Sequence, residues 1–133
     1  ILLQAYLEEL HPYLSRETSA IAHDTPTLRI VERLLQLIVD TAIDVNNHII
    51  KSQKLRTPED FFNTFIVLAQ ANILDYMFAE HIAGSVGLRN RIVHNYEDVS
   101  ATQMVDDIKG GITDYKEYCK QIIAYLDRSS PPS

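Results

Sequence analysis

Apolar residues recur at every third or fourth position along nearly the whole chain, and this spacing constrains the fold more than any other feature of the sequence. It places the apolar side chains on one face of an α-helix, whereas a strand would show alternation at every second position. The pattern is clearest near the C-terminus, in Ala101, Val105, Ile108, Ile112, Tyr115, Cys119, Ile122 and Leu126. We therefore predict an all-α, up-and-down bundle of four to five helices.

The first two helices are expected to follow each other closely. One helix is predicted over residues 1–22, and Pro12 should bend or shorten it because proline removes a helical hydrogen bond. The second is predicted to begin at Thr25-Pro26, since proline suits the first turn of a helix, and to extend to Ile49.

The other three helices are indicated by their first residues. Thr57 is expected to cap a helix that has proline at its first position and acidic residues in its first turn. Asp75 is expected to cap the next helix, which runs into residues 89–94. Ser100 and Gln103 form the pattern of a capping box, which predicts the start of the last helix.

Two features inside these helices bear on their packing. Phe61, Phe62 and Phe65 are predicted to be aromatic residues of the core. Gly110 and Gly111 weaken the middle of the last helix by roughly 1 kcal/mol each relative to alanine. We therefore expect a bend or a close backbone approach at the two glycines.

The composition indicates one globular domain. With 133 residues and 46% hydrophobic content, the chain can form one core but not two, so residues 1–128 are assigned to a single domain and residues 129–133 to a disordered tail. Asp40 and Asp44 interrupt the longest apolar stretch, so no membrane span is expected. The single cysteine, Cys119, excludes an internal disulfide framework and fits a reducing compartment. We expect a cytoplasmic protein without a signal peptide.

The charge distribution restricts the kind of anionic ligand. The formal net charge of -6 counts against extended binding along a phosphate backbone, which needs a basic stripe. A local cationic site is nevertheless present, because Arg89 and Arg91 lie in a stretch with no acidic residue between Glu80 and Glu97. The sequence therefore allows a small site for a single anionic group.

The segment over residues 87–96 carries the side chains best suited to chemistry. Arg89 supplies a permanent cation with a fixed fork of donors that suits a phosphate. His94 can accept or donate a proton near neutral pH. These are the two functions needed to cleave RNA without a metal, because the ribose 2′-hydroxyl must lose its proton and the attacked phosphate must be held as its negative charge grows.

The spacing of the segment can be compared with helix geometry. Asn90 and His94 are four residues apart, so they share a face and the amide can orient the imidazole. Arg89 and His94 are five residues apart, roughly 140° around an ideal helix. They converge only if the arginine wraps around the helix, if the helix unwinds near His94, or if a dimer shares the site. Asn95 suits a C-terminal cap, after which Tyr96 would point the same way as His94.

The pattern Arg89-Asn90-x-x-x-His94 resembles the arginine–histidine signature of HEPN domains, in which the residue after the arginine is often Asn, Asp or His. With Tyr96 added, it is similar to the HepT-type toxins that are paired with a minimal nucleotidyltransferase antitoxin. The segment from Val31 to His48 resembles the long second helix of that group.

The resemblance implies a HEPN-like fold and a toxin that is a metal-independent endoribonuclease with no cofactor. Arg89, Asn90 and His94 would be its catalytic residues, and a homodimer would hold both copies of the motif at a shared cleft. RNA would be the substrate. A cognate minimal nucleotidyltransferase antitoxin would neutralise the toxin by adenylylating Tyr96.

Other interpretations of the same residues stay open. His94 could interact with the dipole of its own helix end, and Tyr96 could close the bundle as a partly buried aromatic. Arg91 is expected to be a solvated cation beside the site. For the chain as a whole, the alternatives are a non-catalytic HEPN-like domain that binds nucleotide or partners a nucleotidyltransferase, and a plain helical dimerisation module. The joint presence of Arg89, Asn90, His94 and Tyr96 favours the ribonuclease.

Polar residues elsewhere are interpreted as structural. The second predicted helix carries a polar stripe of Asp40, Asp44 and Asn47, for which a solvent-facing position is favoured over a place in a dimer cleft. Glu80-His81 lacks the Glu-x-x-His spacing of a di-iron bundle, so no metal site is expected.

Overall fold

The computed structural model describes residues 2–94 and 100–129, and within these ranges it contains seven helices and no strand. The helices are α1 (Leu2–Leu14), α2 (Thr18–Ala22), α3 (Thr25–Ser52), α4 (Phe61–Gln70), α5 (Tyr76–Ala83), α6 (Ser85–His94) and α7 (Ala101–Ser129). The predicted all-α class is confirmed. Seven helices replace the five that were expected because two of the expected helices are interrupted. Ser129 still belongs to α7, and the rest of the expected tail lies outside the described residues.

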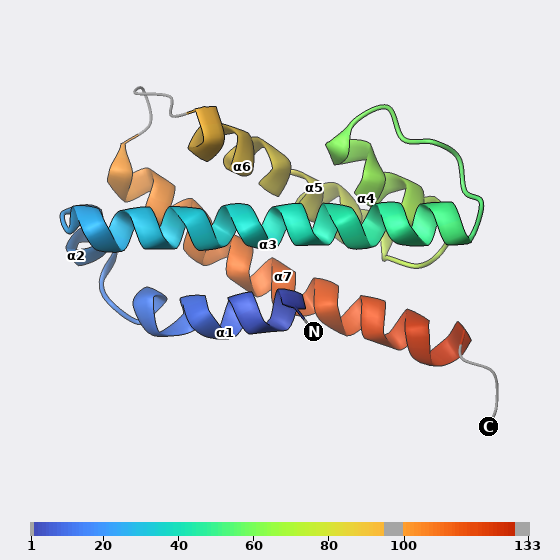
Figure 1. Ribbon diagram of the computed structural model, residues 1–133, viewed down its shortest axis with the longest axis horizontal. Coiled ribbons are helices and arrows are strands. Elements are labelled where there is room, and N and C mark those ends of the chain that lie inside the picture. The colour runs from blue at the N-terminus through green and yellow to red at the C-terminus, as the bar shows by residue number, and fades with distance from the viewer. Residues whose placement is uncertain (1, 95–99, 130–133) are drawn as a thin grey trace.

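Helix α3 is the central element of the bundle (Figure 1). It extends along the whole molecule and contacts α1, α2, α4, α6 and α7. Its amphipathic sequence explains this position, since the buried side chains of α3 recur at helical spacing from Thr27 to Ile50. The residues with no exposed surface include Leu10, Val31, Leu35, Ile38, Val39, Ala42, Phe65, Leu68, Ile108 and Tyr115. The core therefore lies where α1, α4 and α7 meet α3.

The helix expected over residues 1–22 is divided in two. Pro12 lies inside α1, which ends two residues later at Leu14, and the separate short helix α2 follows. The expected effect of Pro12 as a shortening residue agrees with this early end. None of the helices in the described ranges combines the length and apolar character needed to cross a membrane.

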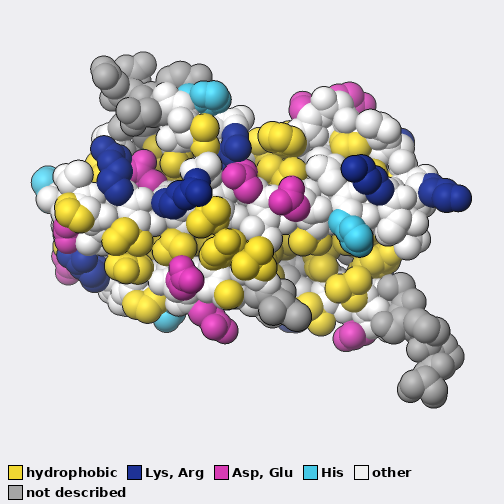
Figure 2. Space-filling model, in the orientation of Figure 1, with side chains coloured by type: hydrophobic (Ala, Val, Ile, Leu, Met, Phe, Trp, Pro, Cys, Tyr) yellow, Lys and Arg dark blue, Asp and Glu magenta, His cyan; other side chains and the backbone are white. Residues whose placement is uncertain are grey.

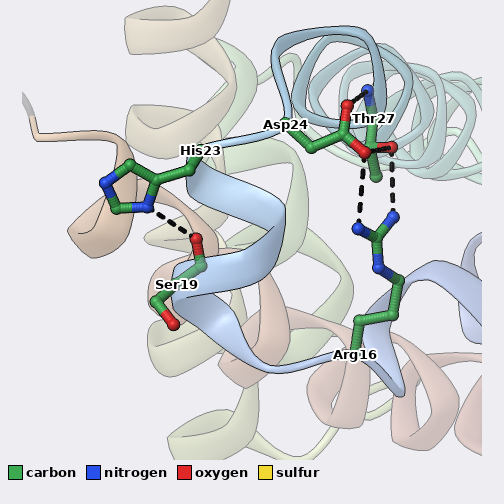
Figure 3. A network of polar contacts seen from close by, with 5 residues as sticks. All are labelled: Arg16, Ser19, His23, Asp24 and Thr27. Atoms are coloured by element: carbon green, nitrogen blue, oxygen red, sulfur yellow. Dashed lines mark hydrogen bonds and ion pairs between the residues drawn. The ribbon is translucent and has the colours of Figure 1, made fainter.

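A polar network fixes the start of α3 (Figure 3). The Asp24 carboxylate caps the helix by accepting from the Thr27 hydroxyl at 2.8 Å and from the Thr27 backbone N–H at 3.4 Å. Arg16 donates to Thr27 and to Asp24 at 3.2 and 3.3 Å, and the ring of His23 lies 2.7 Å from the Ser19 carbonyl oxygen. The bonds from Thr27 are the main reason why the pKa of Asp24 is lowered.

The start of the helix that was predicted after Thr57, which is α4 in the structure, was wrong by several residues. The cap is Asp60 rather than Thr57, because the Asp60 carboxylate accepts from the Asn63 backbone N–H at 2.8 Å and α4 begins at Phe61. The first turn of α4 therefore projects past the core. Phe61 and Phe62 are 48% and 41% exposed, so they are not core aromatics as predicted, whereas Phe65 is fully buried as predicted.

The next two helix starts were predicted correctly. Asp75 caps α5 by accepting from the Phe78 N–H at 3.1 Å, and Ser100 caps α7 by accepting from the Gln103 N–H at 3.1 Å. However, α5 does not run into the motif, because it ends at Ala83 and Gly84 separates it from α6.

The two glycines of α7 do not mark a close backbone approach. The helix continues through both of them. A Cβ added at Gly110 or Gly111 would meet no atom of the described residues within 4 Å, apart from its chain neighbours and the nearby backbone of its own helix. The expectation of a close approach was wrong, whereas the alternative of a bend at the two glycines stays a prediction.

We predict that Gly111→Ala raises the free energy of unfolding by about 0.5–1 kcal/mol, because it removes backbone freedom in the unfolded chain without a steric cost. Urea unfolding followed by circular dichroism measures this. Gly84→Ala is the matched control, since its Cβ would lie only 3.2 Å from the His81 carbonyl oxygen and should not stabilise. Equal stabilisation by both variants, or none by Gly111→Ala, would contradict the assignment.

Candidate active site

The start of α6 is anchored to α7 by a hydroxyl pair. The Ser85 hydroxyl lies 2.6 Å from the hydroxyl of Tyr115, which has no exposed surface. Burial raises the pKa of Tyr115 well above its ordinary value, so this phenol stays neutral and can act as a hydrogen-bond donor. Val86 and Leu88 of α6 are also buried. Together these contacts fix the helix that carries the motif.

Arg89 turns toward α3 and is held by three contacts. Its Nε donates to Asp40 at 2.8 Å, and one terminal nitrogen donates to the side-chain oxygen of Asn90 at 3.1 Å. Its guanidinium carbon lies 6.0 Å from the centre of the Phe61 ring, a cation–π distance. These bonds use two of the five N–H donors of a guanidinium, so donors are left for an anionic ligand. The side chain is 19% exposed.

The position of Asp40 corrects the interpretation of the polar stripe. Asp44 is exposed, as favoured, but Asp40 is partly buried and forms the ion pair with Arg89. The two residues are 49 positions apart in the chain. The stripe therefore does reach the motif, although the sequence was interpreted as favouring a solvent-facing stripe.

His94 is the last residue of α6 and is exposed. The segment stays helical up to His94, so the helix does not unwind before it. Five residues of helix separate Arg89 from His94 by about 7.5 Å along the axis and roughly 140° around it. The structure thus joins Arg89 to Asn90, and helix geometry places the Cα atom of His94 on another side of α6. Asn95 and Tyr96, and with them the expected cap and modification site, lie outside the described residues.

Arg91 is a partly exposed cation with a carboxylate beside it, rather than the fully solvated cation that was expected. It lies 3.5 Å from the Asp107 carboxylate on α7, and its Nε is buried without a partner among the described residues. Asp107 also accepts from the Gln103 side chain at 2.9 Å. Gln103 therefore helps to tie the end of α6 to the start of α7.

The first turn of α4, which begins at Phe61, is linked to α3 and α7 by two buried hydrogen bonds and one partly buried one. The Tyr118 hydroxyl donates to the Asn46 side-chain oxygen at 2.5 Å, and the Asn46 amide donates to the Thr64 hydroxyl at 3.1 Å. Thr64 in turn donates to the Phe61 carbonyl oxygen at 2.7 Å. Side chains from α7, α3 and α4 are thus linked in a chain in which each residue donates a hydrogen bond to the next. Tyr118 and Asn46 could not be singled out from the sequence, since each is one polar group in an apolar helix face.

A groove adjoins the motif on the side of α4. It has a volume of about 440 Å³ and is lined by Asp60, Phe61, Phe62, Ala83, Gly84, Val86, Gly87 and Asn90. The late start of α4 creates it, because the two exposed phenylalanines stand opposite the junction of α5 and α6. The signal in the sequence was Asp60, which is as good a cap residue as Thr57.

Glu80 and His81 do not form part of a metal centre in the described structure. His81 pairs with the Asp114 carboxylate at 3.0 Å. Within residues 2–94 and 100–129, no group of three or more His, Cys, Asp or Glu residues could hold a metal ion.

Comparison with known proteins identifies the family. Residues 3–122 match the family model described as ribonuclease HepT-like. The chain belongs to this family, and the predicted class of endoribonuclease is thereby confirmed.

Similar proteins agree with this assignment. A tRNA nuclease HepT from Aphanizomenon flos-aquae is 37% identical over 125 residues, which cover 94% of this chain and 85% of that protein. An mRNA nuclease HepT from Shewanella oneidensis is 30% identical over 90 residues, which cover 68% of each chain. The structure of a tri-AMPylated Shewanella oneidensis HEPN toxin in complex with an MNT antitoxin has a TM-score of 0.76 and 24% identity, over 92% of this chain and 96% of that one. The predicted HEPN-like fold is confirmed.

We predict that the ion pair between Asp40 and Arg89 contributes little to stability. Because both side chains are partly exposed, a double-mutant cycle with Asp40→Ala and Arg89→Ala should give a coupling energy of about 0.2–1 kcal/mol in urea unfolding. The cycle Arg29→Ala with Glu32→Ala, a surface pair at 2.6 Å, serves as the reference. A coupling of several kcal/mol would show instead that Asp40 is a structural anchor.

Proposed function

We propose that the chain is a toxin of a toxin–antitoxin pair that cleaves RNA without a metal, as a single domain over residues 1–128 acting in the cytoplasm. Arg89, Asn90 and His94 would be the catalytic residues. The main support is the environment of Arg89, because Asp40 and Asn90 fix its orientation while donors stay available for a phosphate. Two HepT relatives are a tRNA nuclease and an mRNA nuclease, so RNA is the substrate class that these two share.

The proposed reaction is an internal attack within RNA. His94 accepts the proton of the ribose 2′-hydroxyl as the 2′-oxygen forms a bond to the adjacent phosphorus. Arg89 donates to the non-bridging oxygens, whose negative charge grows. The bond from phosphorus to the 5′-oxygen breaks, and that oxygen takes up a proton from the imidazolium or from water. The products are a 2′,3′-cyclic phosphate and a 5′-hydroxyl.

A homodimer would complete this site. Helix α6 stays intact up to His94, and Arg89 is engaged on the side of α3. These two observations favour a site completed by a second subunit over one formed within a single chain. A two-fold axis near α6 would place Arg89 of one subunit opposite His94 of the other, so that each dimer holds two sites.

We predict that His94→Ala abolishes RNA cleavage, with a loss of about 10²–10⁴-fold or more, as expected for a proton-transfer group. Arg89→Ala should come close to this loss, and Asn90→Ala should be milder because Asn90 only orients other side chains. Cleavage should persist in EDTA and leave a 2′,3′-cyclic phosphate end, detected by mass spectrometry. Circular dichroism checks that the variants stay helical. Activity that disappears on chelation and returns with magnesium would refute the mechanism.

The same two variants test the shared site. In a mixture of Arg89→Ala and His94→Ala subunits, half of the dimers are mixed and each of these holds one intact site, so activity should return to about a quarter of wild type. Unmixed Arg89→Ala and His94→Ala samples are the controls. No recovery in subunits that demonstrably exchange would place Arg89 and His94 of the same chain in one site.

An antitoxin with nucleotidyltransferase activity would regulate the toxin through Tyr96. The similar Shewanella oneidensis toxin is tri-AMPylated and in complex with an MNT antitoxin. Tyr96 follows the end of α6 by two residues in the sequence, so an added AMP group would bring a negative phosphodiester and steric bulk near the proposed phosphate site.

We predict that Tyr96→Phe leaves toxicity mostly intact but makes it insensitive to the cognate nucleotidyltransferase with ATP. Wild type should gain the mass of one or a few AMP groups in that reaction, because the phenol is the acceptor. Tyr76→Phe, which removes an exposed tyrosine elsewhere, should be modified and silenced like wild type. If Tyr96→Phe protein is still adenylylated and silenced, another residue carries the regulation.

A further inference from the structure

We propose that the groove between α4 and the junction of α5 and α6 is the binding site for a nucleobase of the RNA whose phosphate Arg89 holds. The proposal rests on the proposed ribonuclease function and adds to it the part of the site that contacts a base. Figure 2 shows hydrophobic side chains gathered at the upper edge of the molecule, where the surface is hollowed between α6 and α4.

The aromatic side chains of the groove have the exposure that base stacking needs. Phe61 and Phe62 are 48% and 41% exposed, although Phe65, one turn further along α4, is fully buried. Single-stranded RNA is commonly bound by stacking of unpaired bases on such rings. The backbone of Phe61 is held by a partly buried hydrogen bond from Thr64 to its carbonyl oxygen, and its ring is positioned by the Arg89 guanidinium carbon 6.0 Å away. A ring that is fixed before binding loses little conformational entropy when a base stacks on it.

The charges around the groove favour a phosphate at one end and a base in the rest of the groove. The Arg89 guanidinium lies 6.0 Å from the Phe61 ring at one end, and the Asn90 amide lines the groove beside it. The Asp60 carboxylate lies in the lining and accepts both of its hydrogen bonds from Asn63 through one oxygen. Its other oxygen repels a phosphate but can accept from a base amino group. The phosphate therefore belongs at Arg89, and the base, joined to it through one ribose, belongs in the groove.

Gly87 leaves the groove open. It is exposed, lines the groove, and a Cβ added there would meet no described atom within 4 Å beyond its own neighbours and helix backbone. A larger side chain at this position would occupy the space proposed for the base without changing Phe61, Phe62 or Arg89. Leucine also favours the helix more than glycine does.

The test compares two uncleavable probes, a short single-stranded RNA with 2′-methoxy groups and the same backbone without bases. For Phe62→Leu, which leaves the Phe61 ring beside Arg89 in place, affinity for the probe with bases should fall roughly 5- to 100-fold, the range for loss of base stacking. Affinity for the abasic probe should stay unchanged. Gly87→Leu should have the same selective effect through occlusion. Tyr76→Leu removes an exposed aromatic outside the groove and should bind both probes like wild type.

Each outcome decides for or against the base site. An equal loss for both probes, or no loss in either groove variant, would overturn the proposal. A change of oligomeric state in light scattering, without a selective loss, would assign the groove to contact between two copies of the chain. Because the probes cannot be cleaved, the result is independent of the cleavage tests on His94. Loss of catalysis by His94→Ala with unselective groove variants would leave the ribonuclease assignment intact and reject the base site alone.

Discussion

The hydroxyl of Tyr118 is the polar group on which the arrangement of the bundle depends most. It is almost completely buried, so its hydrogen-bonding capacity must be met within the protein, and an unmet buried polar group costs about 1–3 kcal/mol. The Tyr118 hydroxyl donates to the side-chain oxygen of Asn46. The amide of Asn46 is also buried, and it donates in turn to the Thr64 hydroxyl. Since the three residues belong to α7, α3 and α4, this chain of bonds permits one register of the three helices, whereas apolar packing alone would tolerate several.

The site follows from that register. Thr64 donates to the Phe61 carbonyl oxygen, which fixes the first turn of α4, and the Phe61 ring then lies beside the Arg89 guanidinium. Ser85 and Tyr115 fix the start of α6 in the same manner from α7. Arg89 thus meets Asp40 from α3 and Phe61 from α4 on a helix that α7 holds. The rigid part of the site is built by buried tyrosines, while the side chains assigned to chemistry lie near the surface.

The helical class and most helix starts could be predicted from the sequence because they depend on local chemistry. Asp75 and Ser100 cap helices through bonds to residues three positions ahead. The start of α4 could not be predicted in this way, since Thr57 and Asp60 are both good caps. The structure uses Asp60, in a first turn that is also fixed by Thr64 and Asn46, and those two residues are 18 positions apart. The pairing of Arg89 with Asp40 spans 49 positions, so periodicity placed Asp40 on a face of α3 without revealing its partner. The residues of the motif could therefore be found from the sequence, whereas the distant residues that hold them in position could not.

An acidic chain that acts on RNA presents an apparent conflict, which the site resolves through the kinds of contact it offers. Affinity from many phosphate contacts needs a broad basic surface, and a net charge of -6 works against it. A single oriented guanidinium and a stacking surface need no such field, because the first acts at short range and the second is largely uncharged. The Asp40 carboxylate offsets part of the charge of Arg89 but fixes its direction. Such a site would attract nucleic acid only weakly at long range, and its affinity would depend on an unpaired base next to the phosphate. Selection of single-stranded positions in RNA follows from that dependence, since a base paired within a duplex cannot enter the groove.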